Sequence, residues 1–198
     1  MNALRRILVV LSVVAALSGT AFAAKTVVID AGHGGHDRGG IPRQRLTEKI
    51  YTLDVARRLQ QKLEAAGFRT VMTRSGDYFV GLGQRCAIAN RQRNAVFISV
   101  HFNSGTREGA NGIETYYYSR TSASYAAAVH AQVLRAAGTE NRGIRRRGFY
   151  VLRHTRIPAV LAECGFLTNA KEGRRVTTAA HRQRLADALA AAIISKYQ

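Results

Sequence analysis

Histidines and acidic residues lie close together near the start of this 198-residue chain. The segment 30–37 carries Asp30, His33, His36 and Asp37 among glycines. Neutral histidine is the commonest metal-binding side chain, and glycine allows backbone and solvent to approach it closely. Because the segment follows a short apolar stretch, we expect it to form a loop at the end of a β-strand, where ligands gather in open α/β sheets.

Two other segments could complete a metal site around this loop. Glu48 lies at the expected first turn of a long helix, and His101 lies at the end of the central apolar strand. Two imidazoles and a carboxylate, with water at the fourth position, make up several catalytic zinc sites. His33, Glu48 and His101 would supply this set from three separate elements.

Each of these residues also has a simpler interpretation. Glu48 could complement the dipole of its helix. His101 could be a hydrogen-bonded core histidine, and the glycines around His33 could form a tight turn. No two of the three have the short spacing of a motif such as H-E-x-x-H. Taken alone, the residue types leave zinc as one hypothesis among several.

A further acidic residue lies in a segment that otherwise predicts a buried strand. Glu163 is surrounded by the apolar residues of the segment 158–166. Acidic side chains are rarely buried without a partner. A nearby cation or a water bound to a metal would provide one, and an ion pair with one of the many arginines would do so equally well.

Strand-like segments rich in Val, Ile, Phe, Tyr and Thr alternate along the chain with segments of helical periodicity. The predicted strands are 26–29, 69–73, 95–100, 112–118, 149–152 and 159–162. The predicted helices are 48–66, 122–137 and one that starts near residue 178. This alternation predicts an α/β fold: a single domain with a central, twisted, mostly parallel (mixed) sheet of about six strands and helices on both faces.

Residues 1–23 have the features of a signal peptide. Arg5 and Arg6 precede an apolar run, and Ala21-Phe22-Ala23 fits a cleavage site. The run of about 11 apolar residues is too short to span a bilayer. We therefore expect export to the periplasm or the cell exterior, and a mature domain over residues 25–198 without a transmembrane anchor.

The chain is strongly basic. Its net charge is +18, which falls to +16 without residues 1–23, because that segment carries two arginines and no acidic residue. Such a charge favours polyanionic partners, among them cell-wall polymers, anionic lipids and extracellular nucleic acid. The densest basic patch is the segment 142–147 with Arg153 and Arg156. It could bind carboxylate-bearing or other anionic polymers, or it could be a solvated face without a ligand.

The chain has two cysteines, Cys86 and Cys164, each in an apolar segment. An exported protein could join them in a disulfide. Buried free thiols, which pack as small hydrophobic groups, are the interpretation we prefer.

Seven motifs in order resemble the zinc-dependent N-acetylmuramoyl-L-alanine amidases of the AmiA, AmiB and AmiC type (amidase type 3). The resemblance covers essentially the whole mature chain. The motifs are D-x-G-H-G-G-x-D-x-G from Asp30, Glu48-Lys49, Thr73-Arg74-Ser75-Gly76-Asp77, R-x-x-x-A-N from Arg85, S-x-H-x-N from Ser99, Asn141-Arg142-Gly143 and P-A-V-L-x-E-C-G-F from Pro158. Small departures are Ala31 and Arg38, which stand where many relatives have proline.

The resemblance implies an amidase catalytic domain over residues 25–198. It would hydrolyse the amide between N-acetylmuramic acid and L-alanine in peptidoglycan. His33, Glu48 and His101 match the zinc ligands of the family, and Glu163 matches its catalytic glutamate. His36 falls on a variable position. Relatives that a partner regulates carry a long insertion after the H-x-N motif, whereas only residues 104–111 follow it here before the next predicted strand.

Two further residues could support the site. Asp30 and Asn103 could accept the second ring N–H of a metal-bound histidine or contact substrate, because such histidines usually donate that N–H to an oxygen. Asp30 could equally cap a turn. The expected partners are peptidoglycan and anionic wall polymers, the latter through the basic surface, and we expect a monomer.

Two competing functions are less favoured. Nucleic-acid binding is not expected, because it would need neither zinc nor Glu163. An affinity that falls steeply with salt would distinguish it. A wall-binding module without catalysis would leave the complete set of ligand-like residues without a role.

Overall fold

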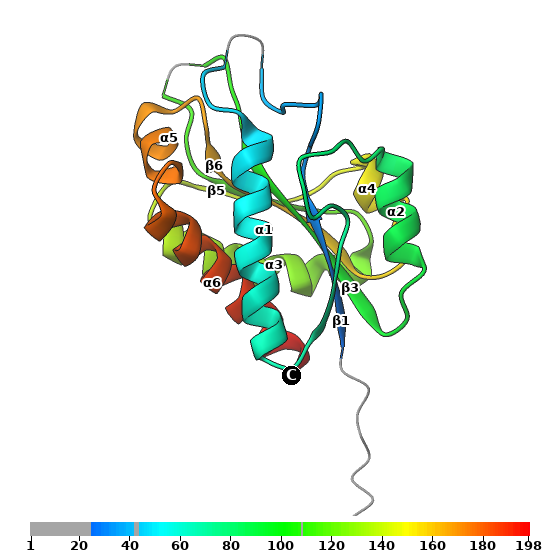
Figure 1. The fold of residues 1–198 in the computed structure, drawn as a ribbon. Coiled ribbons are helices and arrows are strands. Elements are labelled where there is room, and N and C mark those ends of the chain that lie inside the picture. Colours follow the sequence, from blue (N-terminus) through cyan, green and yellow to red (C-terminus); the bar gives the residue numbers. More distant parts are fainter. Residues whose placement is uncertain (1–24, 42–43, 108) are drawn as a thin grey trace, which may run out of the picture.

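The computed structural model describes residues 25–41, 44–107 and 109–198. The expected signal peptide lies outside these residues. In the described part, six strands form one sheet in the order β2-β1-β3-β6-β4-β5, with helices on both faces (Figure 1). The strands are β1 (Thr26–Ala31), β2 (Arg69–Met72), β3 (Ala95–Asn103), β4 (Ile113–Tyr117), β5 (Asn141–Arg146) and β6 (Ala159–Phe166). The helices are α1 (Glu48–Ala65), α2 (Leu82–Asn90), η1 (Arg120–Ser122), α3 (Ala123–Ala137), α4 (Tyr150–Arg153), α5 (Ala170–Val176) and α6 (Ala179–Tyr197).

The sheet is mixed and mostly parallel. β2, β1, β3 and β6 run parallel to one another, β4 runs antiparallel to β6, and β5 runs parallel to β4. This confirms the predicted α/β class and single domain. Because parallel strands end at the same edge, the loops that follow β1 and β3 and the end of β6 lie together.

Two hydrophobic clusters cover the two faces of the sheet. The larger packs α1, α3 and α6 against one face and includes Val100 of β3 and Ala162 of β6. The smaller lies on the face of α2 and α4 and includes Phe97 of β3 and Leu161 of β6. Successive side chains of a strand point to opposite faces, so the central strands carry apolar residues on both.

The face of α2 and α4 becomes polar toward the carboxyl ends of the strands. At two-residue spacing on this face, the residues are Val28 and Asp30 on β1, Phe97, Ser99 and His101 on β3, and Leu161 and Glu163 on β6. The opposite face stays apolar to the ends of the same strands, as Phe102 and Cys164 show. Polar side chains therefore gather at one edge of one face, beyond the short helices that cover the apolar part.

Two predicted elements need correction. The segment 149–152 was predicted as a strand, but α4 is helical, with backbone N–H groups of Arg153 and His154 donating to the carbonyls four residues earlier. A four-residue apolar run has no period that separates strand from helix. β5 takes its place in the sheet and was not predicted, because its basic sequence has no apolar alternation. Arginines are typical of an edge strand, which faces solvent.

The sequence predicted the three long helices of the described residues but missed two shorter ones. Helices α2 and α5 were not predicted. The predicted helices correspond to α1, α3 and α6, and Gly138, with a φ of +56°, ends α3.

Cys86 and Cys164 are both free and buried, which confirms the interpretation as packed thiols. Among the described residues, no helix is long and apolar enough to cross a membrane.

Candidate metal centre and active site

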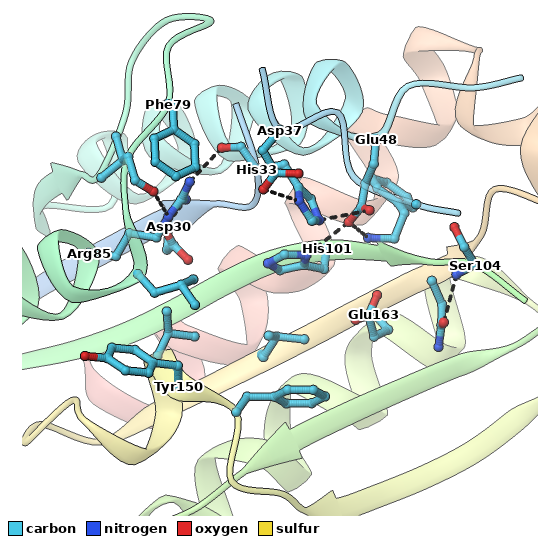
Figure 2. A pocket seen from close by; sticks show the side chains of 18 of the residues that line it. Asp30, His33, Asp37, Glu48, Phe79, Arg85, His101, Ser104, Tyr150 and Glu163 are labelled. Carbon is cyan, nitrogen blue, oxygen red and sulfur yellow. Dashed lines mark hydrogen bonds and ion pairs between the residues drawn. The ribbon is translucent and has the colours of Figure 1, made fainter. Parts of the chain in front are cut away.

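Three side chains from three elements meet at the carboxyl edge of the sheet (Figure 2). His33 lies in the loop after β1, Glu48 is the first residue of α1, and His101 lies near the end of β3. Their potential ligand atoms all lie within 4.8 Å of one another. Nε2 of His33 is 3.0 Å from Oε2 of Glu48, and Nδ1 of His101 is 3.0 Å from Oε1 of Glu48. The structure thus brings together the three residues that the sequence suggested as metal ligands.

Glu48 is held as a buried anion between the two imidazoles. Its exposed fraction is 2%, and Oε1 also accepts the backbone N–H of Phe102 at 2.9 Å. Burial opposes ionisation of Glu48, but the hydrogen bonds and charge of His101 and His33 outweigh it and lower the pKa of this carboxyl. Burial likewise opposes protonation of His33, yet Glu48 and Asp37 raise its pKa. Two imidazoles around one anionic carboxylate form a donor set that suits zinc.

Two glycines make room for these donors. A Cβ atom on Gly32 would lie 2.3 Å from Cε1 of His101, and one on Gly39 would lie 2.5 Å from Oε2 of Glu48. His33 itself has a φ of +62°, which is uncommon for a residue other than glycine. Such conformations persist where the surroundings enforce them, often at functional sites. Close packing of the donors, and not only a turn, therefore requires glycine at these positions.

Two buried arginines hold the backbone of the loop that carries His33. Nε of Arg74 donates to the carbonyl of Ala31 at 2.9 Å, and its Nη2 donates to that of Gly32 at 2.8 Å. Nη1 of Arg85 donates to the carbonyl of Ala31, and its Nη2 donates to that of His33, both at 2.7 Å. Hydrogen bonds from a charged donor are stronger than neutral ones. The sequence prediction gave these arginines no role, although both lie in motifs that carried the resemblance.

Asp37, not Asp30, contacts the histidine of the loop. Nδ1 of His33 lies 2.9 Å from Oδ2 of Asp37, while Oδ1 of Asp37 accepts the backbone N–H of Gly39 at 3.1 Å. Asp37 thereby fixes the orientation of the ring and leaves Nε2 facing Glu48. The spacing of four residues between His33 and Asp37 within a glycine-rich loop was the available sequence signal.

Asp30 accepts the hydrogen bonds of a buried network beside the site. Its carboxylate accepts hydrogen bonds from Arg85 at 2.7 Å and from the hydroxyls of Ser99 and Thr73, each at 2.6 Å. Burial opposes its ionisation, but Arg85 and the two hydroxyls outweigh burial and lower its pKa. Among the described residues, Asp30 has no hydrogen bond to an imidazole and instead binds Arg85, which holds the loop, so contact of Asp30 with substrate remains a prediction.

Glu163 lies on β6 beside the three donors. It is opposite His101 in the parallel pairing with β3 and opposite Glu114 in the antiparallel pairing with β4, so these side chains share one face. Its Oε2 atom is buried and has no hydrogen-bond partner among the described residues. Burial, together with the negative charges of Glu48 and Glu114, raises the pKa of Glu163 well above its usual value. The ion pair with an arginine, one of the two alternatives that the sequence left open, is not formed among the described residues.

Asn103 contacts a carboxylate that the sequence prediction overlooked. Nδ2 of Asn103 donates to Oε2 of Glu114 at 2.7 Å, and its Oδ1 accepts the backbone N–H of Ser104 at 2.8 Å. The same Oε2 of Glu114 accepts the hydroxyl of Tyr116 at 2.9 Å. Asn103 thus has no hydrogen bond to His33 or His101 in the described residues, and contact with substrate remains a prediction.

A cavity of about 610 Å³ opens over this group. Pockets of this size are typical of small-molecule sites. His33, Glu48, His101 and Glu163 all line it (Figure 2). His36 does not line it and instead packs its ring on Phe79, with 4.2 Å between ring centroids. A cavity with three converging donors and an unpaired buried carboxylate oxygen can hold a cation next to a proton acceptor.

The sequence matches a family profile described as N-acetylmuramoyl-L-alanine amidase over residues 27–195. It is also 34% identical over 178 residues to the N-acetylmuramoyl-L-alanine amidase LytC of Bacillus subtilis. That alignment covers 88% of this chain and 36% of LytC, so the chain spans about a third of that relative.

Solved structures show the same architecture. The catalytic domain of CwlV, an N-acetylmuramoyl-L-alanine amidase from Bacillus (Paenibacillus) polymyxa var. colistinus, superposes with a TM-score of 0.82 at 39% identity, over 87% of this chain and 97% of that domain. The N-acetylmuramoyl-L-alanine amidase AmiC2 of Nostoc punctiforme also gives a TM-score of 0.82, at 37% identity, over 87% of this chain and 96% of the other.

Proposed function

The chain belongs to the N-acetylmuramoyl-L-alanine amidase family, and on this premise we propose that it hydrolyses peptidoglycan as a zinc enzyme. The bond cleaved is the amide between the lactyl group of N-acetylmuramic acid and the L-alanine of the stem peptide. The observation that carries the proposal is the meeting of three metal donors with Glu163, whose buried Oε2 lacks a partner.

The residues present fit a zinc ion. His33, Glu48 and His101 would hold it, and three protein ligands are the number found in catalytic rather than structural zinc sites. A bound zinc ion would supply Lewis acidity, which polarises a carbonyl and makes water more acidic. Asp37 would keep the His33 ring oriented toward the ion, since it already binds the opposite ring nitrogen at 2.9 Å.

Glu163 would move the proton. Its carboxylate would accept a proton from the attacking water, whose oxygen bonds to the scissile carbonyl carbon. It would then give this proton to the nitrogen of L-alanine as the C–N bond breaks. The products are the free lactyl carboxylic acid and the peptide with a free amine. One positioned carboxyl group can take both roles, first as base and then as acid.

The proposal also covers where the enzyme acts and what its basic surface binds. Export to the periplasm or cell exterior, directed by residues 1–23, would deliver the enzyme to its substrate. β5 carries exposed arginines along an edge of the sheet, where they could attract anionic wall polymers or the carboxylates of stem peptides. Within the described residues 104–107 and 109–112, which join β3 to β4, no helix covers the cavity.

The test is a metal analysis combined with digestion of defined muropeptides, followed by mass spectrometry. The expected result is a stoichiometric zinc ion and release of an intact glycan fragment and a peptide with a free L-alanine amine. A chelator should abolish this release, and added zinc should restore it. Cleavage of the glycan, or cuts within the peptide, would contradict the proposal.

A further inference from the structure

The cavity has an apolar end that the proposed chemistry does not use. Phe79 contributes to it from the loop before α2, and Leu82 is the first residue of α2. Phe149 and Tyr150 contribute from the residue before α4 and from its first residue. We refer to these four residues as the aromatic rim. We propose that the aromatic rim binds the N-acetylhexosamine rings of the glycan strand beside the scissile amide, an inference that rests on the proposed amidase function.

The members of the aromatic rim are unusually exposed for large apolar side chains. Their exposed fractions are 48% for Phe79, 54% for Leu82, 42% for Phe149 and 45% for Tyr150. All four line the one cavity that also contains Glu163. Exposed apolar side chains that cluster in this way mark ligand grooves, whereas single exposed ones are ordinary. The clustering in the cavity therefore needs a ligand to explain it.

Each ring of the aromatic rim is supported by another ring. Phe79 packs on His36 with 4.2 Å between centroids, and Tyr150 stacks on His154 at 4.2 Å. Phe149 meets Tyr116 edge-on at 4.9 Å. Rings fixed in this way lose little conformational freedom on binding, so their contacts contribute more fully to affinity. The faces left open are flat apolar surfaces, which match the C–H faces of pyranose rings.

The two ends of the cavity differ in chemistry. In Figure 2, Phe79 and Tyr150 lie on one side of the view and Ser104 on the other, with His101 and Glu163 between them. The Ser104 end adjoins Asn103 and Glu114, whose carboxylate draws Arg142 and Arg145 to within 3.5 Å. The arginine side suits the carboxylates of a stem peptide, and the uncharged rim suits neutral N-acetylated sugars.

This polarity agrees with the substrate of the proposed reaction. The scissile amide joins a sugar-bearing lactyl group to a peptide. The glycan therefore extends from the reacting carbonyl on one side, and the peptide extends on the other. With the carbonyl next to Glu163, the rim is the side that offers apolar contact. Arg85, which also lines the cavity there, is already bound to Asp30 and to loop carbonyls.

The test is an NMR titration of the protein with tetra-N-acetylchitotetraose, a glycan probe without peptide. Amide signals at the starts of α2 and α4 should shift. Phe79→Ala and Tyr150→Ala should each weaken binding about three- to tenfold, the range expected for one aromatic contact. Tyr150→Phe keeps the ring and should bind within about twofold of the parent chain. Ile50→Ala removes an exposed apolar side chain of α1 outside the cavity and should change nothing.

The outcomes separate this inference from the proposed function. Hydrolysis of a muropeptide without any shift on addition of the oligosaccharide would overturn the role of the rim and leave the amidase function intact. Shifts confined to the second cavity, which is lined by Gln44 and Leu167 among others, would also overturn it. Oligosaccharide binding at the rim without hydrolysis of any muropeptide would instead contradict the amidase function.

Discussion

Asp30 and Glu163 are acidic residues at the same edge of one sheet, on the same face, yet their surroundings differ in kind. Asp30 accepts three hydrogen bonds, one of them from the guanidinium of Arg85. Glu163 has a buried oxygen without a partner and two other carboxylates nearby. Burial opposes ionisation of both, but the pKa of Asp30 is lowered and that of Glu163 is raised.

Under the proposed function, the difference separates a structural carboxylate from a reactive one. Where both oxygens accept hydrogen bonds from buried partners, a carboxylate stabilises its neighbours. Where a buried oxygen is left unpaired, the folded state bears a cost that a role in binding or catalysis would explain. Substitution of each carboxylate in turn tests this division, because activity, stability and zinc affinity should respond differently.

The largest effect is expected on activity. Glu163→Gln keeps the size of the side chain and removes its ability to carry a proton, so the amidase rate should fall by about a hundredfold or more. Bound zinc and the free energy of unfolding should be retained. Glu64→Gln, on the exposed end of α1, is the control and should leave the rate unchanged. A rate for Glu163→Gln near that of the parent chain would remove Glu163 from the mechanism.

A large effect on stability is expected at the other carboxylate. Asp30→Asn leaves the guanidinium of Arg85 buried without its counter-charge, which should cost about 3–5 kcal/mol in the free energy of unfolding. Urea titration of metal-free protein measures this. Asp54→Asn, which breaks pairs with Arg58 and Arg182 at the surface, should cost about 1 kcal/mol or less. Equal losses in the two variants would contradict the structural role of Asp30.

An intermediate effect is expected at Asp37, a half-exposed carboxylate that acts through His33. Asp37→Asn should weaken zinc binding about 10- to 100-fold, because the ring loses the partner that orients it. Competition with a zinc-binding dye measures the affinity. Asp187→Asn, which removes an exposed partner of Lys62, should bind zinc as the parent chain does. An unchanged affinity in Asp37→Asn would show that the loop backbone alone orients His33.

The smallest effect concerns pH. The pKa of Asp30 in the folded state lies below its ordinary value of 3.8, so its stabilisation is present above that value and is lost as pH falls through the lowered pKa. The stability difference between the parent chain and Asp30→Asn should stay constant from about pH 7 to 5 and shrink below about pH 4. Urea titrations of metal-free protein across this range provide the check. A difference that grows in acid would contradict the assigned direction.

Much of the fold and the site could be predicted from the sequence. The central strands and the long helices follow from apolar periodicity, which is a local property. His33, Glu48 and His101 could be named because their residue types are unusual at strand and helix ends, and the ordered motifs supported them. The failures were also local in origin: β5 lacks an apolar pattern, and α4 is too short for a period to be recognised.

The partners of the polar residues could not be predicted in the same way. Asp30 and Asp37 are both carboxylates of one glycine-rich segment, and nothing in their spacing indicates which one contacts His33. The choice depends on Arg85, 55 residues along the chain from Asp30, whose guanidinium binds Asp30 on one side and the loop carbonyls on the other. Likewise, only the pairing of β4 with β6 places Glu114 opposite Glu163.

The sequence by itself thus determined the fold class, the apolar core and the residues that we propose hold a metal and move a proton. The tertiary structure decided which carboxylate has hydrogen-bond partners and which has an unpaired oxygen. It also decided that the aromatic rim and the three metal donors share one cavity. The physical reason is that periodicity and residue type act within a few residues. Hydrogen bonding and burial of charge depend instead on groups that meet only when the sheet has formed.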